Sequence, residues 1–190
     1  MKQGFIVLIS GPSGVGKGTL INSLLADKSL NLTFSVSMTT RKPRPNEKHG
    51  VHYFFVSHET FLENIERNNF LEHAQFVGNR YGTPRDYVYT LLNKGKNVLV
   101  EIEVDGACQL LNSVPKDQVL SLYIMPPTVE DLIKRLRHRG SEDEATIMQR
   151  AERFKEEVKY KDLYQWTIIN DDLQTCIDEV KALIRGKINS

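Results

Sequence analysis

Residues 5–19 read FIVLISGPSGVGKGT, an apolar run that passes directly into a glycine-rich loop. The loop matches the pattern G-x-x-x-x-G-K through Gly11, Gly16 and Lys17, and apolar residues recur at helical spacing from Leu20 onward. Glycines let successive backbone N–H groups turn inward around an anion, and the following helix points the positive end of its dipole at that anion. A strand, a glycine-rich loop and a helix in this order predict a phosphate-binding loop rather than a flexible turn.

The loop departs from the common pattern at one position. Residue 18 is glycine, and the hydroxyl expected there arrives one residue later, at Thr19. Lys17 is expected to reach the outer phosphates of a nucleotide, and Thr19 to bind or orient the shell of a magnesium ion. The residues predicted to bind the donor phosphates are Gly11, Pro12, Ser13, Gly14, Val15, Gly16, Lys17, Gly18 and Thr19.

Apolar runs that alternate with helical patterns indicate the fold class. Residues 5–9, 98–102, 119–125 and 166–169 are mainly apolar and do not alternate with polar residues, which is typical of strands buried on both faces of a parallel sheet. Helical patterns begin near Lys17, Pro84, Thr128, Ser141 and Asp172. The sequence therefore predicts one α/β domain of the P-loop NTPase type, a parallel sheet flanked by helices.

Residues 34–84 break this alternation. VHYFFVS and FLEHAQFVGNRYGTP are strand-like, and HETFLENIER between them is helical. These features predict a small antiparallel insertion over the carboxyl edge of the sheet, where ligands bind in open α/β folds.

Composition excludes several classes of function. The 25 lysine and arginine residues nearly balance 24 aspartate and glutamate residues, so no global basic field attracts a nucleic acid polymer or a membrane. Cys108 and Cys176 are isolated, which fits a reducing compartment better than a disulfide framework. No apolar stretch approaches the roughly 20 residues that span a bilayer. We therefore expect a cytoplasmic protein.

A second phosphate site is predicted in FSVSMTTRKPRPNEKHGVHYFF, residues 34–55. Arg41 and Arg44 flank Pro43, which stiffens the backbone between them. Two guanidinium groups displayed together suit a phosphate. A solvated basic loop and a nucleic-acid patch are the alternatives, and the near-neutral chain argues against the patch.

The motifs GPSGVGKGT, SVSMTTRKPRP, FLEHAQFVGNRYGTP, EIEVDGA, PPTVEDLIKRLRHRG and NDDL occur in an order that resembles the guanylate kinase family over essentially the whole chain. The resemblance implies transfer of the γ-phosphoryl group of ATP to GMP, with Mg²⁺ as cofactor. It also implies three parts: a core of residues 1–33, 85–126 and 160–190, a GMP-binding insertion of residues 34–84, and a mobile helical lid of residues 127–159.

The resemblance implies a set of GMP-binding residues: Ser37, Arg41, Arg44, Tyr53, Glu72, Tyr81, Thr83 and Glu101. The chemistry of guanine supports the role of Glu72, because a carboxylate accepts from both N1–H and N2–H₂ of guanine but meets a lone pair at N1 of adenine. The hydroxyls of Ser37 and Thr83 can donate to O6 or N7. A buried polar site that the wrong base leaves unpaired discriminates by about 10⁴-fold in favourable cases.

On the donor side, Arg135 and Arg139 share one face of a predicted helix, and Arg150 lies on the next helix. The resemblance implies that these arginines fold over the triphosphate, where a single arginine is worth about 10³–10⁵ in rate. With Lys17 they are the predicted catalytic residues. Asn170 resembles a residue near the donor adenine. An exposed cationic helix is the alternative for the arginines.

Magnesium is expected to be held mainly through phosphates and water. Glu101 and Glu103 end the run NVLVEIE on one face of a strand, and with Thr19 they are the candidate side chains for the metal shell. Two other functions stay open: an interaction module that has kept the fold and lost catalysis, and a kinase of another monophosphate such as AMP. Use of dGMP as an acceptor is also left open.

Overall fold

The apolar run after Phe5 forms β1 (Ile6–Ser10), the central strand of a parallel sheet with the order β2-β7-β1-β8-β9. The computed structural model describes residues 2–190. The other strands of this sheet are β2 (Leu32–Phe34), β7 (Asn97–Glu101), β8 (Val119–Met125) and β9 (Trp166–Ile169). All of β1 is buried, which explains its continuous apolarity.

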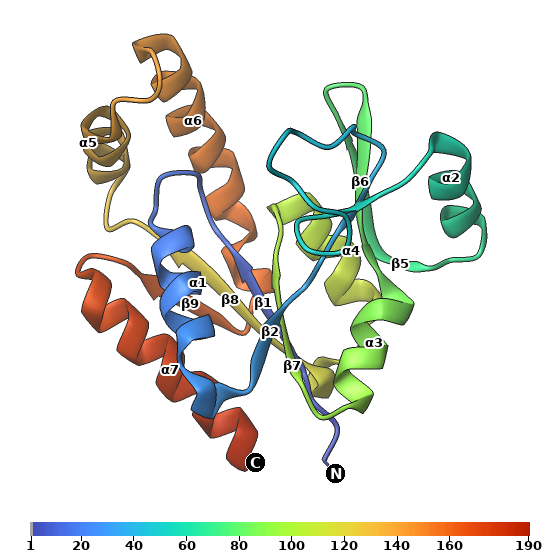
Figure 1. Ribbon diagram of the computed structural model, residues 1–190. Helices are drawn as coiled ribbons and strands as arrows, with labels where there is room; N and C mark the ends of the chain where they lie inside the picture. The colour runs from blue at the N-terminus through green and yellow to red at the C-terminus, as the bar shows by residue number, and fades with distance from the viewer. Residues whose placement is uncertain (1) are drawn as a thin grey trace.

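Helices cover both faces of this sheet, as Figure 1 shows: α1 (Lys17–Ala26), α3 (Arg85–Asn93), α4 (Val104–Ser113) and α7 (Leu173–Asn189). Val7 and Ile9 belong to the core shared with α1 and α7. Ile6 and Leu8 belong to the core shared with α3 and α4. Alternate residues of one buried strand therefore hold the two helical layers together.

The chain between β2 and α3 forms a second sheet, of order β4-β3-β6-β5. Its elements are β3 (Met38–Thr39), β4 (Phe54–Phe55), α2 (His58–Glu66), β5 (Phe70–Phe76) and β6 (Asn79–Pro84). β6 pairs antiparallel with β3 and β5, but β3 and β4 are parallel. The predicted antiparallel insertion is therefore present in β3, β6 and β5, and β4 is an added parallel strand, because the long connection from β3 to β4 brings the chain back in the same direction.

Two helices, α5 (Val129–Arg139) and α6 (Glu144–Glu157), stand above the phosphate-loop side of the large sheet (Figure 1). Thr128 caps α5 as predicted, since its hydroxyl accepts from the N–H of Asp131 at 3.1 Å. The predicted start of α6 at Ser141 is wrong, because Asp143 caps this helix by accepting from the N–H of Thr146 at 2.8 Å. Within residues 2–190, three short 3₁₀ segments complete the secondary structure: η1 (Lys28–Leu30), η2 (Lys116–Gln118) and η3 (Val158–Leu163).

Two elements of the core lie outside the sequence prediction. β2 spans only Leu32–Phe34, which is too short for a periodic pattern. α4 begins at Val104, directly after the acidic run that the sequence assigns to a strand end. In the described range 2–190, no helix combines the length and the apolarity that crossing a membrane requires.

The hairpin between β5 and β6 turns through Val77 and Gly78, whose φ angles are +46° and +75°. Val77 is 80% exposed, so little packing offsets the strain of a β-branched residue in this conformation. We expect Val77→Asn to raise the free energy of unfolding by about 0.5–1 kcal/mol, because asparagine tolerates positive φ in tight hairpins. Urea unfolding measures the change. Val51→Asn, at an exposed valine without positive φ, is the control, and an equal gain there would contradict the explanation.

Candidate active site

The glycine-rich loop lies between β1 and α1 at the carboxyl edge of the large sheet. Gly16 adopts a φ of +100° directly before α1, and a Cβ on Gly11 would lie 2.1 Å from the carbonyl oxygen of Ile124. Both positions therefore require glycine. The first turn of α1 begins where the loop ends, which is the arrangement that binds phosphate at helix N-termini.

Lys17 folds over this loop. Its Nζ donates to the carbonyl oxygens of Gly11 at 2.6 Å and Pro12 at 3.0 Å. Burial lowers the pKa of Lys17, and the nearby carboxylates of Glu101 and Glu157 partly oppose that shift. A desolvated ammonium held only by carbonyls gains much from a charged phosphate, because few opposing water contacts have to be given up.

A pocket of about 500 Å³ opens beside Lys17. Its lining includes Thr19 and Glu101, two of the three candidates for the magnesium shell, together with Arg139. Glu101 is exposed at the end of β7. The predicted loop, lysine, hydroxyl and acid therefore meet around one space, although they come from different elements.

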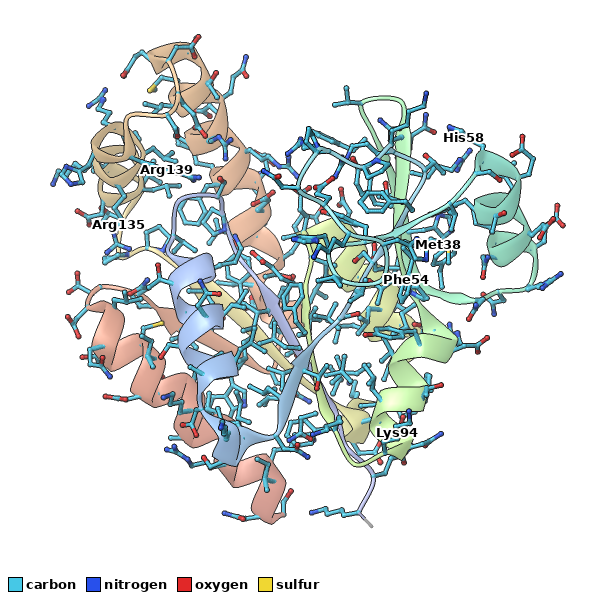
Figure 2. All side chains as sticks on the ribbon, viewed as in Figure 1. Met38, Phe54, His58, Lys94, Arg135 and Arg139 are labelled. Carbon is cyan, nitrogen blue, oxygen red and sulfur yellow. The ribbon has the colours of Figure 1, made fainter. Side chains whose placement is uncertain are left out.

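The two arginines predicted on α5 have different surroundings. Figure 2 labels Arg139 and Arg135 on this helix, opposite Met38 and Phe54 of the insertion. Arg139 lines the pocket beside Lys17. Arg135 instead donates to the carbonyl oxygen of Asp171 at 3.2 Å and does not line that pocket. Helical spacing alone cannot separate these two positions.

A second space of about 610 Å³ adjoins the first, and Lys17 and Glu101 line both. Arg150 lines the second pocket; its guanidinium donates to the hydroxyl of Ser13 in the loop and pairs with Glu142 at 2.7 Å. Phe76, near the tip of the β5–β6 hairpin, lines the same pocket. The insertion and α6 therefore border one cleft.

Arg153 is a member of this pocket that the sequence prediction missed. It pairs with Glu103 and, at 2.6 Å, with Glu157. Its position three residues after Arg150 on one helix was the available signal. Glu103 does not extend the strand with Glu101, because β7 ends at Glu101 and Glu103 precedes the first turn of α4.

The predicted acceptor-phosphate residues cluster in the insertion. The guanidinium of Arg41 lies 5.5 Å from the ring centre of Tyr53, and the rings of Tyr53 and Tyr81 are 6.1 Å apart. Glu47 pairs with Arg41 at 2.8 Å and accepts from the N–H of Arg44 at 2.8 Å. Arg41 lowers the pKa of Glu47 to about 2, so this carboxylate stays ionised. Glu47 was not anticipated, and it fixes one edge of Arg41.

Glu72 lies on β5 and is 7% exposed. The hydroxyl of Thr83 on β6, which is fully buried, donates to Oε1 of Glu72 at 2.6 Å. Burial raises the pKa of Glu72, and the bonds from Thr83 partly oppose the shift. Ser37 is half-buried next to β3, and its carbonyl accepts from the N–H of Phe54 at 2.8 Å. The residues predicted to read the base therefore come from β6, from β5 on one side of it, and from the residue directly before β3 on its other side.

Asn170 lies behind the glycine-rich loop. Its side chain is buried and donates to the carbonyl oxygen of Val15 at 2.7 Å, while its N–H donates to the carbonyl of Met125 at 2.8 Å. In this structure Asn170 supports the backbone of the loop. Across residues 2–190, no three His, Cys, Asp or Glu side chains gather into a preformed metal site.

The sequence model of the family described as guanylate kinase matches residues 3–187. A guanylate kinase of Mycoplasmoides gallisepticum is 46% identical over 183 residues, which cover 96% of this chain and 93% of the relative. A guanylate kinase of Malacoplasma penetrans is 43% identical over 187 residues, 98% of this chain and 95% of the relative. The crystal structure of guanylate kinase from Anaplasma phagocytophilum aligns with a TM-score of 0.70 at 30% identity, covering 98% of this chain and 87% of that one. Because the family match and the identity both extend over nearly the whole sequence, this chain belongs to the guanylate kinase family.

Proposed function

We propose that the two bordering sites divide the reaction of this family, transfer of the γ-phosphoryl group of ATP to GMP, into a donor side and an acceptor side. Membership of the family assigns the chain this ATP:GMP phosphotransferase activity. The observation that carries the division is the pocket lined by Lys17 of the loop, Arg150 of α6 and Phe76 of the insertion. Donor and acceptor phosphates meet there.

On the donor side, the loop from Gly11 to Thr19 holds the phosphates of ATP. Lys17 leaves the loop carbonyls and pairs with the outer phosphates, and Arg139 and Arg150 neutralise charge on the transferred group. An acceptor-phosphate oxygen attacks directly, so the protein works by positioning and by supplying positive charge rather than through a side-chain nucleophile. Arg135 takes part after α5 moves, because its present contact is with Asp171.

On the acceptor side, Arg41, Arg44, Tyr53 and Tyr81 bind the phosphate of GMP. Arg41 is already oriented by Glu47 and by the ring of Tyr53. The guanine base is held by Ser37 and Glu72, with Glu101 as a further acidic contact. Thr83 contributes by donating its one hydroxyl proton to Glu72, so in this arrangement it does not donate to O6 or N7 as the sequence predicted. Burial raises the pKa of Glu72 because the carboxylate has little contact with water. The same poor solvation favours guanine, since its two N–H donors supply hydrogen bonds that water does not provide.

Magnesium belongs to the same proposal. Thr19 and Glu101 place oxygen atoms on the lining of the pocket beside Lys17. This donor set fits Mg²⁺, which keeps several water ligands and otherwise binds to phosphates and to one or two protein groups. When bound, the ion neutralises charge on the β- and γ-phosphates. Glu103 is held by Arg153 and is an outer candidate for the same shell.

The parts of the chain have matching roles. Insertion 34–84 and lid 127–159 close over core segments 1–33, 85–126 and 160–190, and they exclude the water that would otherwise hydrolyse ATP.

A cytoplasmic location is proposed from the two isolated, free cysteines. The alternative of an inactive interaction module is not favoured, because relatives that match over nearly their full length are guanylate kinases.

The test is release of ADP from ATP with Mg²⁺ in the presence of GMP, dGMP, AMP, CMP or UMP. We expect turnover with GMP to exceed turnover with AMP by about 10³-fold or more, because adenine presents a lone pair at N1 to the buried Glu72 where guanine presents N–H donors. The dGMP reaction decides the open question of a second acceptor. Equal turnover of AMP and GMP would refute the role of Glu72, and a folded protein that binds GMP without turnover would favour the interaction module.

A further inference from the structure

We infer that helix α4 is the support of the base-reading carboxylate, with Gly106 and Gln109 as positioning residues that set the preference for guanine. The inference rests on the proposed role of Glu72. α4 belongs to the face of the large sheet, whereas Glu72 belongs to the insertion, so the contact between them joins the two parts of the molecule.

Gly106 makes room for the carboxylate. It is buried in the first turn of α4, and a Cβ added there would lie 2.9 Å from Oε2 of Glu72 and 3.4 Å from its Cδ. The other carboxylate oxygen, Oε1, is bound by the hydroxyl of Thr83 at 2.6 Å. Glu72 is therefore enclosed between a hydroxyl on β6 and a helix position that has no side chain.

The first turn of α4 also favours the ionised form of Glu72. The backbone N–H groups of a first helical turn carry a partial positive charge, and Oε2 lies against this turn at Gly106. Burial acts in the opposite direction and raises the pKa of the carboxyl group. Close approach to the helix thus helps a buried acid to stay charged, which two N–H donors of guanine require.

Gln109, one turn further along α4, holds the strand that carries Glu72. Its Oε1 accepts from the N–H of His73 at 3.1 Å, and its Nε2 donates to the carbonyl of the same residue at 3.1 Å. The amide therefore pairs with β5 as a neighbouring strand would. Ser113 adds a third bond, to the carbonyl of Leu71 at 3.3 Å. The residues on both sides of Glu72 are tied to one helix.

The test is Gly106→Ala. Alanine favours the helix, and the clash falls on the flexible end of Glu72, so we expect folding to be kept and the carboxylate to be displaced. We expect kcat/KM for GMP to fall about 10–100-fold and the preference for GMP over AMP to shrink, with KM for ATP changed less than about twofold. Gly186→Ala is the matched control, because Gly186 is also helical and no described atom lies within 4 Å of the added Cβ.

A second substitution distinguishes displacement of the Glu72 carboxylate from a general loss of structure in Gly106→Ala. Glu72→Asp shortens the side chain, so combining it with Gly106→Ala relieves the clash, and the double variant should exceed Gly106→Ala alone by about threefold or more in kcat/KM for GMP. Additive losses in the double variant would overturn the role of Gly106.

Gln109→Leu removes both bonds to His73 at an exposed position, and we expect KM for GMP to rise about 3–10-fold. Gln75→Leu, on the exposed end of β5, is its control. A wild type that prefers GMP while Gly106→Ala and Gln109→Leu are unchanged would overturn only the inference about α4. A wild type without that preference would overturn the proposed base reading itself.

Discussion

Lys17→Ala is expected to lower kcat for GMP phosphorylation by about 10²–10³-fold, the loss seen when one preorganised donor to the transition state is removed. The ammonium lies over the loop on the carbonyls of Gly11 and Pro12, close to where the outer phosphates of ATP bind in our proposal. Steady-state ADP release at saturating ATP and GMP measures the effect. The Lys17→Ala variant keeps all the glycines of the loop, so its backbone should still bind a nucleotide.

Stability should respond in the opposite sense to activity. Because burial lowers the pKa of Lys17, the folded protein bears a cost for keeping this ammonium charged, and alanine removes that cost. We therefore expect the melting temperature of Lys17→Ala to be equal to or above that of the wild type. Lys94→Ala is the control for both turnover and melting temperature, because Lys94 is an exposed lysine after α3, at the opposite end of the sheet from Arg139 (Figure 2).

Near-normal turnover of Lys17→Ala would mean that the loop has another role.

Glu72→Gln should reduce kcat/KM for GMP by about 10²-fold and reduce the preference for GMP over AMP by a larger factor. The amide can still accept from Thr83, so the local structure is kept, but it replaces one acceptor for guanine with a donor. Turnover of GMP and AMP under identical conditions measures both quantities. Glu66→Gln, at the exposed end of α2, is the control.

The dependence on pH gives the same substitution a second readout. In our proposal guanine binds the ionised carboxylate of Glu72, and burial raises the pKa of this group above its ordinary value of 4.5. In the wild type, KM for GMP should therefore rise as pH falls through this raised pKa, since the protonated acid offers one acceptor fewer. Glu72→Gln does not titrate and should lack this step. The same step in both proteins would assign the titration to another group.

Local sequence was sufficient for the features whose cause is local. Gly11 and Gly16, with Lys17 directly after Gly16, predict the phosphate loop, because the shape of this loop depends on the backbone angles of residues adjacent in sequence. The runs that became β1, β7 and β8 are apolar without strict alternation because helices cover both of their faces. The same prediction was wrong for β9, which lies at the edge of the sheet and buries only Ile168. Thr128 caps α5 for a reason contained within four residues.

Other features arise only from the tertiary structure, since they join residues with no sequence relation. Arg150 meets Ser13, 137 positions away, and Gln109 meets His73, 36 positions away. Arg135 and Arg139 share a helix, yet only Arg139 lines the pocket beside Lys17. The sequence by itself determined the α/β fold, the phosphate loop and the chemistry available to a guanine site. The tertiary structure decided which charged groups share the cleft and placed Glu72 against Gly106, because packing between distant elements, not local preference, sets those distances.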